Sequence, residues 1–185
     1  MVMVAIPTSH TAHMETFKSL WGLRGAAGFE YVKGHDTGIS RNILAKRAIE
    51  KGYDRILYVD ADMVIPEDAL ELMSEGDADV VSALYPKRSD RTKANVYRES
   101  PCSPLPYSDF LPGRIPISFC GFGCVLVKTE LLKRMEYPWF QFCEYPNGDI
   151  LSEDFFFCQE AMRAGAVMEA DTRVRCGHIL EEVYA

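Results

Sequence analysis

The feature of this sequence that most constrains its fold is a short apolar run that ends in two carboxylates. Ile56 to Val59 are consecutive apolar residues, a pattern typical of a strand buried on both faces of a sheet. Asp60 and Asp62 follow at once, separated only by Ala61. Alternate residues of extended backbone project to the same side, so we expect both carboxylates to face one way. In an open α/β sheet they would border the ligand crevice at the carboxyl end of the strand.

Two carboxylates held so closely repel each other unless a cation lies between them, and their oxygens suit a divalent metal. His178, near the end of the chain, could complete such a site if the last strand returns beside Asp62, because a neutral imidazole can join carboxylates around Mn²⁺. The alternative is that Asp60 and Asp62 only solvate and cap a strand-to-helix turn, and that His178 is exposed.

Strand patterns alternate with helix patterns through the first half of the chain. The sequence predicts strands over 2–6, 29–33, 56–59 and 78–84, and helices over about 13–23, 40–51 and 66–75. Strand character over 117–127, helices that begin at Thr129 and Ser152, and short strands over 166–169 and 172–176 complete the pattern. The β-α-β-α-β-α-β order is typical of a mainly parallel sheet covered by helices, and without a linker or repeat we expect residues 1–185 to form a single domain.

The regular alternation stops between Tyr85 and Ile115. This stretch contains five prolines, at positions 86, 101, 104, 106 and 112, and we expect it to be a functional loop that faces an acceptor substrate. Within it, Lys87 to Arg98 holds five basic residues and one acid, which could bind a phosphate or an acidic acceptor or could form a solvated face.

The composition argues against several classes of protein. The net charge of −7 argues against nucleic acid as the main partner. No run approaches the roughly 18 apolar residues of a membrane span, and the start lacks the basic segment of a signal peptide, so we expect no transmembrane segment and a cytoplasmic location. The six cysteines show no CxxC spacing, which favours reduced thiols over a zinc site.

Two predicted helices begin with polar residues that could serve a site. Arg41 and Asn42 follow Ser40, the expected N-cap, and the free N–H groups and a guanidinium could both hold phosphate there, although Arg41 could also be solvated. Glu153 and Asp154 lie at the positive end of a later helix dipole. That position keeps them ionised, as a general base requires, although helix stability alone would also favour acids.

In their order along the chain, these residues resemble the GT-A glycosyltransferase family, especially its small family-2-like and Anp1-like members that use nucleotide sugars. The matching residues are Ile6-Pro7-Thr8, Ser40-Arg41-Asn42, Asp60-Ala61-Asp62 as the DxD motif, Gly121-Phe122-Gly123, Ser152-Glu153-Asp154 and His178. The resemblance covers nearly the whole chain. It implies a GT-A fold, which has a single Rossmann-like, mainly parallel sheet flanked by helices and a small antiparallel part. It further implies that residues 1–84 bind the nucleotide and residues 85–185 the acceptor.

The resemblance also implies a role for each matching residue. Asp60, Asp62 and His178 would be the ligands of Mn²⁺ or Mg²⁺, with Asp60 contacting the ribose or the metal. The residues that would contact the nucleotide sugar are Pro7, Thr8, Arg41, Asn42, Asp60 and Asp62. Asp154 would deprotonate the acceptor hydroxyl, while Glu153 would orient that hydroxyl or a donor hydroxyl.

The function implied is that of a metal-dependent glycosyltransferase of the hexosyltransferase class. It would transfer a sugar from a UDP- or GDP-sugar to an unidentified acceptor, with inversion by analogy with inverting members, and a homo-oligomer is left open. One alternative is a sugar-phosphate nucleotidyltransferase, which would need a glycine-rich, basic loop after the first strand, whereas residues 7–10 contain neither glycine nor Lys or Arg. The other is a non-catalytic module that binds nucleotide sugars. The absence of a QxxRW motif and of a membrane span argues against a processive polysaccharide synthase.

Overall fold

Helices and strands alternate along the first half of the chain, as predicted. The computed structural model describes residues 1–9, 11–99, 103–108, 110–145 and 148–179. Its first elements are β1 (Val2–Thr8), α1 (Met14–Trp21), β2 (Gly28–Lys33), α2 (Thr37–Glu50), β3 (Arg55–Val59), β4 (Met63–Val64), α3 (Ala69–Met73) and β5 (Val80–Leu84). The later elements are β6 (Lys93–Tyr97), β7 (Pro104–Pro106), β8 (Arg114–Pro116), β9 (Phe119–Cys120), β10 (Cys124–Lys128), α4 (Thr129–Arg134), β11 (Cys143–Glu144), β12 (Ile150–Leu151), α5 (Glu153–Arg163), β13 (Met168–Arg175) and β14 (Gly177–His178).

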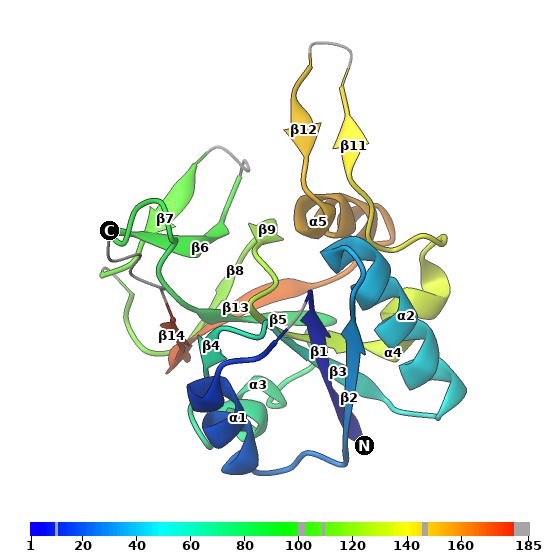
Figure 1. Cartoon of the computed structure of the whole chain (residues 1–185). Helices are drawn as coiled ribbons and strands as arrows, with labels where there is room; N and C mark the ends of the chain where they lie inside the picture. The colour runs from blue at the N-terminus through cyan, green and yellow to red at the C-terminus, as the bar shows by residue number, and fades with distance from the viewer. Residues whose placement is uncertain (10, 100–102, 109, 146–147, 180–185) are drawn as a thin grey trace, which may run out of the picture.

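A seven-stranded sheet in the order β2-β1-β3-β10-β5-β13-β8 runs through the centre of the molecule (Figure 1). The predicted α/β class is confirmed, with helices on both faces of this sheet. Three of its strand pairs are parallel, β1 with β2, β1 with β3, and β5 with β13, whereas β10 runs antiparallel to both β3 and β5 and β8 antiparallel to β13. The antiparallel share is therefore larger than the sequence predicts. The reason is that Gly123 lies at the carboxyl end of β3, where its carbonyl accepts the Asp60 N–H, so β10 starts there and runs back along β3.

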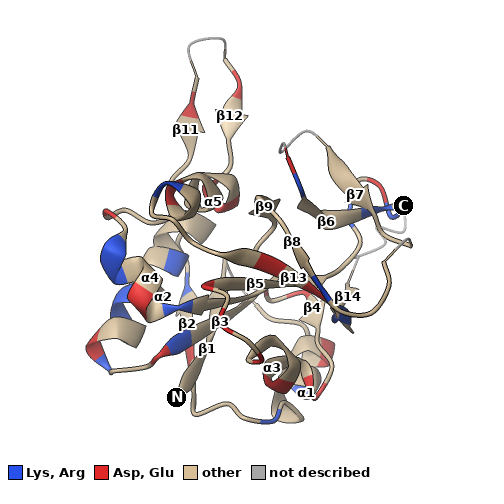
Figure 2. Cartoon of the chain, turned by 180° about the vertical axis from the view of Figure 1, so that it is seen from behind, with Lys and Arg blue, Asp and Glu red and all other residues tan. Residues whose placement is uncertain are grey.

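The two faces of the sheet carry separate hydrophobic cores. Residues of α2, α4 and α5 form the larger core with Tyr58, Phe122, Phe140 and Phe157, whose rings contact one another, and α1 and α3 form the smaller core on the opposite face. The hairpin of β11 and β12 projects away from the sheet beyond α5 in both views (Figure 1, Figure 2). Among the described residues, none of the helices has the length and apolar character needed to cross a bilayer.

Three sequence predictions about local structure are wrong. Helix α2 begins at Thr37 instead of after Ser40, because the side chain of Asp36 accepts the Ile39 N–H over 2.9 Å and so caps the helix one turn earlier. The described part of 85–115 is not one loop, since it contains β6, β7 and β8, and β6 pairs with β7 and β9. The two short strands predicted after residue 165 form one strand, β13, with an irregularity between Asp171 and Arg175.

The glycines at 121 and 123 are explained by the side chain of Tyr85. A Cβ on Gly123 would lie 2.7 Å from Cζ of this tyrosine, and one on Gly121 would lie 2.8 Å from its hydroxyl. The hydroxyl in turn accepts the N–H of Gly123 over 2.8 Å, and the carbonyl of Gly123 accepts the Asp60 N–H over 3.0 Å. Residues 121–123, the glycine loop, are thus packed directly onto the DxD segment through backbone contacts that a residue larger than glycine would prevent.

Tyr85→Phe should lower the free energy of unfolding by about 1–3 kcal/mol, because the buried N–H of Gly123 would lose its acceptor. Urea denaturation of the full chain measures the change. Tyr31→Phe is the matched control, since that ring is 67% exposed, and it should alter the free energy by less than about 0.5 kcal/mol. Equal free energies of unfolding for the two variants would contradict the role of the Tyr85 hydroxyl as the acceptor of the Gly123 N–H.

Candidate active site

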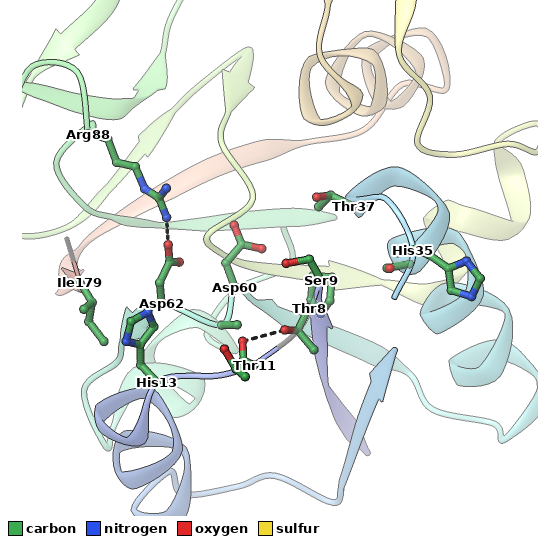
Figure 3. A pocket seen from close by; sticks show the side chains of 13 residues that line it. Thr8, Ser9, Thr11, His13, His35, Thr37, Asp60, Asp62, Arg88 and Ile179 are labelled. Atoms are coloured by element: carbon green, nitrogen blue, oxygen red, sulfur yellow. Dashed lines mark hydrogen bonds and ion pairs between the residues drawn. The ribbon is translucent and has the colours of Figure 1, made fainter. Parts of the chain in front are cut away.

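A cavity of about 720 Å³ opens at the carboxyl ends of β1 and β3, where the DxD segment predicts a site. Its lining is mostly polar and comes from five parts of the chain (Figure 3). The lining residues are Pro7, Thr8, Ser9, Thr11, His13, His35, Thr37, Ser40, Asp60, Ala61, Asp62, Arg88 and Ile179. Of the residues predicted to contact the nucleotide or metal, Pro7, Thr8, Asp60 and Asp62 line this cavity, whereas Arg41, Asn42 and His178 lie behind the lining.

The backbone from Asp60 to Asp62 is a turn and not the extended segment that the sequence analysis assumes. The turn closes with the Met63 N–H donating to the Asp60 carbonyl over 3.1 Å. The carbonyl of Ala61 accepts the backbone N–H of His13 and the hydroxyl of Thr16, each over 3.0 Å, and the Asp62 carbonyl accepts the Ile179 N–H over 2.9 Å. The start of α1 and Ile179, which follows β14, therefore fix this turn from both sides.

Asp60 is held by the buried guanidinium of Arg41. Arg41 is only 3% exposed, and its two terminal nitrogens donate to Asp60 Oδ1 over 3.0 Å and to Glu153 Oε1 over 2.6 Å. The guanidinium carbon lies 5.3 Å from the ring centre of Phe122 and 5.9 Å from that of Phe140. Arg41 thus joins α2, the DxD turn and the first residue of α5, and it is not the solvated arginine that the sequence left as an alternative.

The charge balance of this cluster leaves negative charge in excess. Burial opposes the charge of Arg41, but Asp60, Glu153 and Asp154 outweigh it and raise the pKa of the guanidinium. Burial raises the pKa of Glu153, and Arg41 only partly offsets this because one guanidinium serves several carboxylates. Arg41 therefore faces three carboxylates, those of Asp60, Glu153 and Asp154, and negative charge is in excess around it.

Asp62 faces a different cation and the predicted histidine. Oδ2 of Asp62 forms an ion pair with Nη2 of Arg88 and lies 3.5 Å from Nε2 of His178. The last strand, β14, returns to pair with β4 so that His178 lies opposite Met63, which is the condition set for the histidine in the sequence analysis. Burial is the main cause that lowers the pKa of His178, so the imidazole is neutral at neutral pH.

Asp154 lies beside the glycine loop and not in the lining of the cavity. Its Oδ1 accepts the hydroxyl of Ser152 and the Phe155 N–H, the latter over 2.8 Å. Oδ2 lies 3.7 Å from the position that a Cβ on Gly121 would occupy. Ser152 is the N-cap of α5, as predicted, but its hydroxyl bonds this carboxylate and makes no cap hydrogen bond with the backbone.

Asn42 faces the protein interior. Its amide oxygen accepts the N–H groups of Trp139 and Phe140, over 3.0 and 3.2 Å, and its amide nitrogen donates to the Phe140 carbonyl over 2.7 Å. The asparagine therefore anchors this segment against α2. Trp139 and Phe140 are themselves 7% and 2% exposed and belong to the larger core.

The sequence analysis missed Ser40 and Arg88 as individual site residues. Ser40 is completely buried and lines the cavity, and its hydroxyl has no hydrogen-bond partner among the described residues. The sequence places the start of this helix one turn too late and so predicts Ser40 as the cap, whereas in the structure Ser40 lies inside α2 and lines the cavity. Arg88 belongs to the basic segment 87–98 that the sequence does single out, but nothing in the sequence distinguishes it from its basic neighbours.

Comparison with known proteins shows the fold. No protein family and no curated protein matches the chain by sequence. The solved structure of A197 from STIV matches with a TM-score of 0.74 at 19% identity, over 97% of this chain and 86% of that one. S. aureus TarS 1–349 in complex with UDP-GlcNAc matches with 0.58 at 14% identity, over 100% and 62%, and GalNAc-T7 with UDP, GalNAc and Mn²⁺ matches with 0.64 at 12% identity, over 98% and 44%. This chain spans less than two thirds of the TarS and GalNAc-T7 chains. The fold is that of the GT-A glycosyltransferases.

Asn42→Ala should lower the free energy of unfolding by about 2 kcal/mol or more, because buried N–H and carbonyl groups at Trp139 and Phe140 would lose their partners. The same variant should keep its affinity for UDP within about threefold. Urea denaturation and calorimetric titration measure the two quantities. If the variant is as stable as the parent chain but no longer binds UDP, Asn42 contacts the nucleotide, as the sequence analysis predicts.

Proposed function

We propose that this chain is a glycosyltransferase that moves a sugar from a nucleoside diphosphate sugar to an acceptor hydroxyl, with Mn²⁺ or Mg²⁺ as cofactor. The observation that carries the proposal is the polar cavity at the DxD turn, where the lining residue Asp62 lies 3.5 Å from His178 and negative charge is in excess around Arg41. Two proteins of the same fold were solved with UDP-GlcNAc or with UDP and Mn²⁺, which supports a UDP-sugar as donor.

The side chains around Asp62 fit a divalent cation in their chemistry. A carboxylate oxygen and an imidazole nitrogen 3.5 Å apart form a mixed oxygen and nitrogen donor set that Mn²⁺ accepts, and Asp60 adds a further carboxylate from the same turn. In the described part of the chain no three His, Cys, Asp or Glu side chains are already grouped closely enough to hold a metal ion. Asp60, Asp62 and His178 would hold it after a local side-chain movement. When bound, the cation would neutralise the charge of the diphosphate as it leaves.

Other residues of this chain would bind the nucleotide sugar, position the carboxylates and accept the proton of the acceptor. Thr8, Ser40 and the first turn of α2 would bind the nucleotide sugar, since Ser40 offers an unused hydroxyl to the cavity. Arg41 would keep Asp60 and Glu153 in place. Asp154 would take the proton of the acceptor hydroxyl on Oδ2, because Oδ1 is already engaged by Ser152 and the Phe155 N–H. We assign the acceptor to the half formed by 85–185 and an inverting outcome, in which Asp154 acts as a base.

Two other functions are less well supported. A sugar-phosphate nucleotidyltransferase would hold phosphates on a glycine-rich, basic loop after β1, and the described residues of that loop, Ser9 and Thr11 among them, supply neither. A non-catalytic module would have no reason to bury Arg41 and Glu153 beside the cavity, because buried ion pairs are weak sources of stability.

UDP with Mn²⁺ should raise the melting temperature of the full chain by roughly 5–10 °C at a ligand concentration about a hundred times the dissociation constant. The shift should be absent in Asp62→Asn, which removes a proposed metal ligand. Glu67→Gln is the matched control, because it removes one exposed carboxylate outside the cavity, and it should keep the full shift. A panel of UDP- and GDP-sugars then identifies the donor by hydrolysis. The proposal is wrong if no nucleotide raises the melting temperature with metal present.

Asp154→Asn should lower the rate of sugar release from the donor at least about 100-fold, because the base would be lost, while the UDP affinity stays within about threefold. Glu160→Gln, on the same helix and paired with Arg163, is the control and should keep the rate. A parallel loss of UDP affinity in Asp154→Asn would assign the residue to binding instead.

A further inference from the structure

Arg88 reaches from the segment between β5 and β6 into the cavity, where Figure 3 shows its ion pair with Asp62, and it also contacts His178. Its Nη2 pairs with Asp62 Oδ2, and its Nε donates to His178 Nε2 over 2.8 Å. The same two acceptor atoms lie 3.5 Å from each other. One guanidinium therefore occupies the position between the carboxylate oxygen and the imidazole nitrogen.

The histidine is held in the form that a metal ligand needs. Because Nε2 accepts a hydrogen bond from Arg88, its proton is on Nδ1, which lies 3.3 Å from the carbonyl oxygen of Pro86. A histidine ligand requires a free lone pair on one nitrogen and commonly donates its other N–H to a carbonyl or carboxylate. The edge contact with the Tyr85 ring, 5.6 Å between centres, also limits how far the imidazole can turn.

Arg88 is the loosely held member of the three. Its side chain is 61% exposed, whereas those of Asp62 and His178 are 17% and 12% exposed. The backbone of Asp62 is fixed by the Ile179 N–H, and β14 fixes His178. Exposed arginine pairs contribute only about 0–1 kcal/mol, so the guanidinium can leave at low cost while its partners stay in place.

We propose that Arg88 is a resident cation that competes with the divalent metal for Asp62 and His178. The guanidinium closes the metal site when no metal is present, and it swings into solvent when the metal binds, because two cations cannot share one position. This inference rests on the proposed function in taking a divalent metal as the ligand of these side chains. It adds that the metal affinity of the enzyme is set partly by an arginine which is not itself a ligand.

Calorimetric titration of the full chain with Mn²⁺ alone, in the absence of nucleotide, tests the competition. Arg88→Ala should bind Mn²⁺ roughly three- to fivefold more tightly than the parent chain, because the competing pair is worth up to about 1 kcal/mol. Arg91→Ala is the matched control, since Arg91 is an exposed residue of the same basic segment and its removal makes the same change in net charge. Its Mn²⁺ affinity should stay within about twofold of the parent.

Equal Mn²⁺ affinities of the two variants, weaker binding by Arg88→Ala, or no binding by either variant would overturn the competition. The competition would also be overturned if the parent chain bound UDP equally well with Mn²⁺ and in EDTA while Arg88→Ala failed to bind UDP in EDTA. Arg88 would then replace the metal. Melting curves of both variants confirm that they are folded. Failure of the parent to hydrolyse any nucleotide sugar would defeat the proposed function but would leave this metal titration interpretable.

Discussion

The buried guanidinium of Arg41 is the contact on which the geometry of the site depends. An isolated charge in the interior costs several kcal/mol, so Arg41 is stable there only because Asp60 and Glu153 both reach it. That requirement brings together α2, the turn after β3 and the start of α5. The flanking rings of Phe122 and Phe140 belong to the main hydrophobic core, so the packing of the interior and the position of the Asp60 carboxylate cannot vary independently.

The two carboxylates of the DxD turn are paired with cations of different character. Asp60 faces a guanidinium that is 3% exposed and fixed by two carboxylates, whereas Asp62 faces one that is 61% exposed. A fixed cation orients its partner permanently, while an exposed one can exchange with another cation. The spacing of one residue between the acids therefore places a carboxylate with a fixed partner and a carboxylate with an exchangeable partner within a single turn.

Local sequence patterns predicted the strands and the position of the cavity, because apolar runs and terminal acids act over a few residues. The runs that became β1, β3 and β5 were identified, and the DxD segment lies at the carboxyl end of β3 as expected. The pair of Arg41 and Glu153 could not be foreseen, since 112 positions separate the two residues. The inward orientation of the Asn42 side chain could not be predicted for the same reason. Its hydrogen-bond partners lie about a hundred residues further along the sequence and make no local pattern with it. The start of α2 was missed because Asp36 and Ser40 are both good caps, and only the tertiary packing of Ser40 decides between them.

The insertion of β10 between β3 and β5 has a consequence for how the chain folds. Strands β3 and β5 are not neighbours in the sheet, so its centre cannot close until β10 has docked between them. A fragment ending at Leu84 would therefore carry two unsatisfied sheet edges in its middle and would be prone to aggregate. Contacts of such large sequence separation are slow to form, so we expect the docking of β10 to be a late step of folding.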